Sequence, residues 1–127
     1  MAALTHLRHE LIQRLRSAFE SWDLKPAAAY LFGSTARRES SAASDIDICI
    51  VQPRELDDPD RRDWRKQVDA LASDVNTWTG NDVRMLELGD DEVRARISHD
   101  PLLDSIREDG IRLAGSDDPL ADISTRS

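Results

Sequence analysis

Apolar residues recur along this chain in two spacings, and each spacing predicts one kind of element. Positions three and four residues apart share one face of a helix, whereas positions two apart share one face of a strand. The helical spacing predicts helices over residues 2–22, 60–78, 89–97 and 102–108. Short apolar runs predict strands over residues 28–32, 46–51, 82–88 and 111–114.

This order of elements predicts an α/β (α+β) fold, in which a small mixed sheet is flanked by helices. The chain has 127 residues, the length of one domain with a modest core. We expect a single domain over residues 1–115. Residues 116–127, SDDPLADISTRS, are polar enough to predict a disordered tail.

Candidate phosphate-binding residues follow the first predicted strand. Gly33 and Ser34 suit a tight turn in which backbone N–H groups are open to a ligand. Residues 34–39 predict a short helix, whose free N–H groups and dipole can hold phosphate oxygens. Arg37 would lie one turn into this helix, close enough to contact a phosphate.

Two carboxylates mark the start of the second predicted strand. Asp45 and Asp47 lie on either side of Ile46, so strand alternation puts both acids on the face opposite Ile46, Ile48 and Ile50, about 7 Å apart. Two adjacent carboxylates repel each other unless a divalent cation takes oxygen ligands from both. The pattern therefore predicts a magnesium site beside the phosphate turn.

Gly33-Ser34, a ten-residue gap and Asp45-Ile46-Asp47 together resemble the GS-x10-DxD motif of the nucleotidyltransferase (DNA polymerase beta-like) superfamily. The small size resembles its minimal (MNT) branch, antitoxin-like proteins that are typically paired with a HEPN toxin. The resemblance implies a nucleotidyltransferase-like fold and transfer of a nucleoside monophosphate, AMP from ATP, to a hydroxyl acceptor such as a toxin. It also implies that Asp45 and Asp47 hold two Mg²⁺ ions and that Gly33, Ser34 and Arg37 bind the nucleotide.

A third carboxylate is expected on the strand at 82–88, where it would complete the metal site or act as the base. The simplest overlay places Arg84 at that position. Asp82 shares the strand face of Arg84 and is our candidate for the third catalytic and metal-binding acid, whereas Glu87 lies on the opposite face. If no acid reaches the metals, the chain is a weak or inactive antitoxin that acts by direct association with its partner.

Charge and hydropathy narrow the range of functions. A formal net charge of -8 disfavours unaided binding to a long nucleic acid and suits a metal–nucleotide ligand or a basic protein partner. No apolar stretch reaches the roughly 18 residues that a membrane span needs, so we expect a cytoplasmic protein. Arginines flank Trp64, but the helical spacing around it favours a core aromatic over a base-stacking surface.

Overall fold

The computed structural model describes residues 2–33, 46–53, 56–96 and 99–115. All of the predicted helices and strands in these ranges are present, with ends that differ by a few residues from the predicted ones. The elements, in chain order, are α1 (Ala2–Ser21), β1 (Ala28–Phe32), β2 (Ile46–Val51), α2 (Asp58–Thr79), β3 (Val83–Leu88), α3 (Asp90–Arg96), α4 (Pro101–Asp109) and β4 (Ile111–Ala114). The helix predicted at 34–39 and the tail predicted at 116–127 lie outside the described residues.

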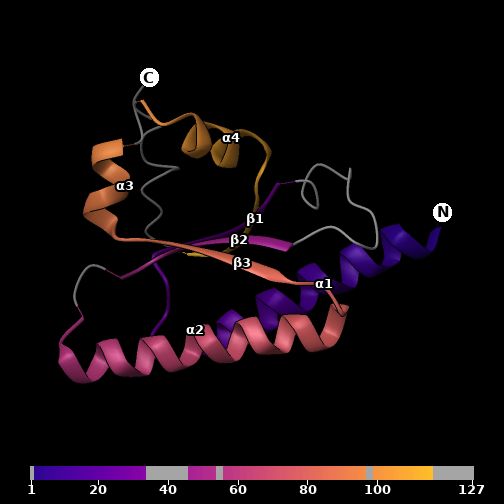
Figure 1. Ribbon diagram of the computed structural model, residues 1–127, viewed down its shortest axis with the longest axis horizontal. Helices are drawn as coiled ribbons and strands as arrows, with labels where there is room; N and C mark the ends of the chain where they lie inside the picture. Colours follow the sequence, from indigo (N-terminus) through magenta and orange to yellow (C-terminus); the bar gives the residue numbers. More distant parts are fainter. Residues whose placement is uncertain (1, 34–45, 54–55, 97–98, 116–127) are drawn as a thin grey trace.

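The strands form one mixed sheet, as predicted, and their order in it is β3-β2-β1-β4. β1 pairs antiparallel with β2 and with β4. β2 and β3 are parallel, which is possible because α2 carries the chain back from one end of the sheet to the other. Helices α1 and α2 cover one face of this sheet, and α3 and α4 cover the other (Figure 1).

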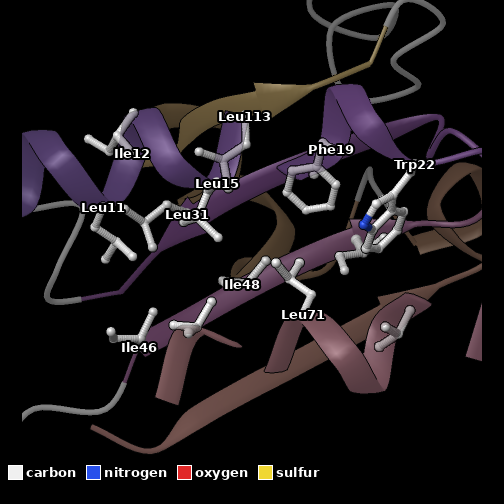
Figure 2. Close-up of a cluster of buried hydrophobic side chains, with 14 of the residues drawn as sticks. Leu11, Ile12, Leu15, Phe19, Trp22, Leu31, Ile46, Ile48, Leu71 and Leu113 are labelled. Atoms are coloured by element: carbon white, nitrogen blue, oxygen red, sulfur yellow. The ribbon is translucent and has the colours of Figure 1, made fainter. Parts of the chain in front are cut away.

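Alternation along β2 divides its side chains between these two faces. Ile46, Ile48 and Ile50 share one face, as predicted, and belong to the apolar cluster under α1 and α2. Figure 2 shows Ile46 and Ile48 in this cluster. Cys49 and Val51 belong to a second cluster, which α3 and α4 cover. By the same alternation, Asp47 lies on the face of Cys49 and Val51. The candidate acid is therefore separated by the sheet from the larger core.

The long helix α2 begins and ends at residues that suit helix termini. The Asp57 side chain accepts a hydrogen bond from the Asp60 backbone N–H, and Pro59 lies in the first turn. Gly80 ends the helix with a left-handed backbone, and its N–H donates to the Asn76 carbonyl. Trp64 is 2% exposed within the core, so the prediction of a core aromatic is confirmed.

None of the helices among the described residues combines the length and the apolar character that crossing a bilayer requires.

Candidate active site

Antiparallel pairing brings the end of β1 to the start of β2. Phe32, the last residue of β1, lies opposite Asp47 in the register. Gly33 follows Phe32 directly and has a positive φ of 75°, a conformation that glycine adopts without the steric cost of a Cβ. The glycine bend and the candidate acid, which are distant in sequence, are therefore neighbours at one end of the sheet.

Gly33 is in direct contact with the Asp47 side chain. A Cβ at position 33 would overlap Asp47 Oδ2 and would lie 3.3 Å from its Cγ. Any side chain at position 33 would therefore displace the carboxylate or the bend. The sequence predicted that these two residues would be neighbours, while their roles toward a phosphate and a cation stay predictions.

On the other side of Asp47 lies β3. The parallel register pairs Asp47 with Arg84, and Arg84 Nε is 3.1 Å from Asp47 Oδ1. The Asp47 side chain is 16% exposed, whereas that of Arg84 is 70% exposed. Water screens the guanidinium, so this ion pair contributes about 0–1 kcal/mol to stability. A ligand that bound Asp47 more strongly could displace Arg84 at little cost to the fold.

Asp82 and Glu87, the two acids considered as a third carboxylate, lie in different environments. Asp82 directly precedes β3 on the strand face of Arg84; its side chain is exposed, and its carbonyl accepts a 2.9 Å hydrogen bond from the N–H of Ile46. Glu87 lies on the opposite face, where it accepts hydrogen bonds from Trp64 Nε1 at 3.1 Å and from Arg65 at 2.6 Å. Glu87 therefore joins β3 to α2 and faces away from Asp47.

The structure thus brings Gly33, Asp47 and the start of β3 together at one end of the sheet. The predicted site residues Ser34, Arg37 and Asp45 lie outside the described residues. Arg84 stands at the position expected for the third acid, and its ion pair with Asp47 was not predicted. The opposite charges of Asp47 and Arg84 could have indicated this ion pair, but only with knowledge of the register that places the two residues side by side.

A divalent cation fits part of this arrangement. Carboxylate oxygens are the ligands that Mg²⁺ prefers, and Asp47 offers a carboxylate in contact with the glycine bend. Within the described ranges, no three His, Cys, Asp or Glu side chains gather as a metal-binding group. The position on β3 that adjoins Asp47 carries a positive charge where a third acid was expected, so it does not suit a metal ion.

Comparison with known proteins agrees with the motif. The family model described as "Polymerase beta, Nucleotidyltransferase" matches residues 13–117. No curated protein matches the chain.

Several solved structures share the fold. A toxin–antitoxin crystal structure with AMP-PNP has a TM-score of 0.57 and 21% identity, covering 91% of this chain and 82% of that chain. The toxin–antitoxin pair MntA-HepT has a TM-score of 0.51 and 21% identity, covering 93% of this chain and 84% of that chain. A protein from Shewanella oneidensis has a TM-score of 0.51 and 17% identity, covering 91% and 79%.

At these identities the structural likeness shows a common fold, while the family match covers most of the chain and includes Gly33, Asp47 and β3. The chain therefore belongs to the polymerase beta nucleotidyltransferase family.

Proposed function

We propose that this protein is a magnesium-dependent nucleotidyltransferase that moves AMP from ATP to a hydroxyl group on a partner protein. The observation that carries the proposal is the contact between the Gly33 bend and the Asp47 carboxylate. A triphosphate needs a backbone that it can approach closely, and its magnesium needs carboxylate oxygens within the same small space. Residues 33 and 47 meet both needs at one end of the sheet.

The site residues divide into those that would hold the metal ion and those that would hold the nucleotide. Asp47, together with Asp45, would hold Mg²⁺, which when bound neutralises charge on the triphosphate. Gly33 and Ser34, with Arg37, would hold the terminal phosphates and so orient the α-phosphorus toward the acceptor. The acceptor oxygen forms a bond to that phosphorus as the bond to pyrophosphate breaks, and the hydroxyl proton passes to a carboxylate, for which Asp82 is the candidate.

A protein acceptor is the substrate class that we favour. The similar solved structures are toxin–antitoxin pairs, one of them with AMP-PNP. A formal charge of -8 suits a basic protein partner better than a polynucleotide, because like charges would repel the phosphate backbone. We therefore propose a HEPN-type toxin as the partner and an exposed hydroxyl, such as that of a tyrosine, as the acceptor.

A second candidate function is that of an antitoxin that binds its partner with little or no catalysis. The observation that favours it is Arg84, a cation that is paired with Asp47 at the position of the expected third acid. In this case the acidic surface of the domain would cover a basic partner by direct association. A bound nucleotide would then support the structure and would not react.

The test is transfer of label from ATP to the partner in the presence of Mg²⁺. The partner to use is the protein encoded by the neighbouring gene. Asp47→Asn should lower the rate about a hundredfold or more, the scale of losing one preorganised charged group. Glu87→Gln is the matched control, because it neutralises a carboxylate on the other face of the same sheet and should keep the wild-type rate.

The results separate the two candidates. Label on the partner that disappears in Asp47→Asn supports transfer, and a similar loss in Asp82→Asn would support Asp82 as the base. Tight association without label, equal in wild type and Asp47→Asn, would refute transfer and support the antitoxin that acts by binding.

A further inference from the structure

The ion pair between Arg84 and Asp47 is set by the backbone. In a parallel pair of strands, residues in register hold their side chains on the same face a few ångströms apart. The register places Arg84 beside Asp47, and Nε lies 3.1 Å from Oδ1. The register holds the Arg84 backbone beside that of Asp47, so this carboxylate is within reach of the guanidinium.

Asp47 is less exposed than Arg84, so water screens the interaction less on the Asp47 side of the pair. Gly33 closes the Oδ2 side of the carboxylate, and 16% of the Asp47 side chain is exposed. A charge close to a partly buried group acts through a medium of lower dielectric constant than water and is felt more strongly. Arginine also keeps its charge at every physiological pH. Any cation that approaches Oδ1 therefore meets a permanent positive charge.

We propose that Arg84 takes the place of one of the two divalent cations of the site. Its guanidinium supplies positive charge at Asp47 Oδ1, where a third acid would instead have recruited a metal ion. The site then binds a divalent cation weakly by itself and takes a single ion together with a nucleotide. The part of this inference that concerns the nucleotide rests on the proposed function, and the part that concerns the metal alone does not.

The first experiment measures Mn²⁺ binding to the nucleotide-free protein by calorimetry or by electron paramagnetic resonance. Arg84→Asp should raise the Mn²⁺ affinity at least about tenfold, because it replaces a repelling charge with a ligand. Arg84→Gln, which removes the charge and adds no acid, should give an intermediate rise.

Arg62→Asp is the matched control. It makes the same change in net charge at an exposed position on α2, which covers the other face of the sheet. Its Mn²⁺ affinity should stay within about twofold of wild type, since a distant exposed charge is screened by water and salt. Equal affinities in Arg84→Asp and Arg62→Asp would overturn the inference. Arg84 is 70% exposed and Arg62 is exposed, so all three variants should fold, which circular dichroism would verify.

The second experiment counts Mn²⁺ ions bound per molecule of a bound, non-hydrolysable ATP analogue. We expect about one ion in wild type and about two in Arg84→Asp, the number in a two-metal site. Two ions in wild type would overturn the inference and leave the proposed function intact. Failure of every variant to bind the analogue would instead refute the proposed function, while the nucleotide-free experiment would still decide the role of Arg84.

Discussion

Gly33 and Gly80 adopt nearly the same backbone conformation in very different surroundings. Their φ angles are 75° and 73°, both in the left-handed region. A Cβ at Gly33 would overlap the Asp47 carboxylate, whereas a Cβ at Gly80 would meet no described atom within 4 Å. Gly80 is therefore required by its backbone conformation alone, whereas Gly33 is required both by its backbone conformation and by its close contact with Asp47.

Substitution by alanine should distinguish these two reasons. Gly80→Ala should lower the free energy of unfolding by about 1–3 kcal/mol, the cost of a left-handed non-glycine residue. Gly33→Ala should cost more, because the carboxylate must move as well, and it should weaken binding of an Mn²⁺–ATP analogue. Urea unfolding and calorimetry measure the two effects. If both variants lost the same stability and bound the ligand as wild type does, the Gly33–Asp47 contact would not contribute to ligand binding.

The junction between α3 and α4 depends on one carboxylate. Asp100 begins α4 by accepting a hydrogen bond from the Leu102 N–H at 2.9 Å, and it accepts another from Arg96 Nε at 2.9 Å. The Arg96 hydrogen bond is the main cause that lowers the pKa of Asp100 below its ordinary value, and the Leu102 N–H adds to the effect. The ionised carboxylate is therefore the form that stabilises the fold.

Acid should weaken this junction. A lowered folded-state pKa means that the contribution of Asp100 is complete above its ordinary pKa of 3.8 and is lost as the pH falls through the lower, folded value. Asp100→Asn keeps a capping oxygen and removes the charge. It should be less stable than wild type at neutral pH, with the difference shrinking below about pH 4, as urea unfolding at several pH values would show. A difference that is constant with pH would contradict this account of the ion pair.

At the scale of elements, the sequence was a good guide wherever local rules decide the structure. Pro59 and Gly80 marked the ends of α2, and alternation in residues 46–51 assigned each isoleucine to its face. The contacts of Glu87 with Trp64 and Arg65 were not foreseen. They depend on the distance and rotation between α2 and β3, which periodicity along a single chain does not contain.

The whole molecule has apolar clusters on both faces of one sheet, and they share the strands between them. Leu71 belongs to the cluster under α1 and α2, and Leu103 belongs to the cluster under α3 and α4. Strands that are packed on both faces lose part of their buried contacts if the helices on either face unfold. The two layers should therefore unfold together.

Truncation of either leucine should lower the stability of the entire fold. We expect Leu71→Ala and Leu103→Ala each to cost about 2–5 kcal/mol. Trp22, Trp64 and Trp78 all lie on the α1 and α2 side, so tryptophan fluorescence reports that layer and circular dichroism reports all helices. In Leu103→Ala both signals should shift to the same, lower urea concentration. A fluorescence midpoint equal to that of wild type would show instead that the two layers unfold independently.

The site, by comparison, could be predicted only in part. The motif predicted that Gly33 and Asp47 would face each other at one end of the sheet, and the antiparallel pairing of β1 and β2 brings them together there. The neighbour of Asp47 on β3 was harder to predict. It follows the 22-residue helix α2, and the register of a parallel pair so far apart in sequence is set by packing of the whole domain.

β3 is an edge strand of the sheet, and the Arg84 side chain on it is mostly exposed to solvent. A substitution at position 84 therefore changes the charge beside Asp47 and leaves the apolar clusters on both faces of the sheet untouched. Position 84 is therefore a place where one residue can set the charge at this end of the sheet independently of the fold.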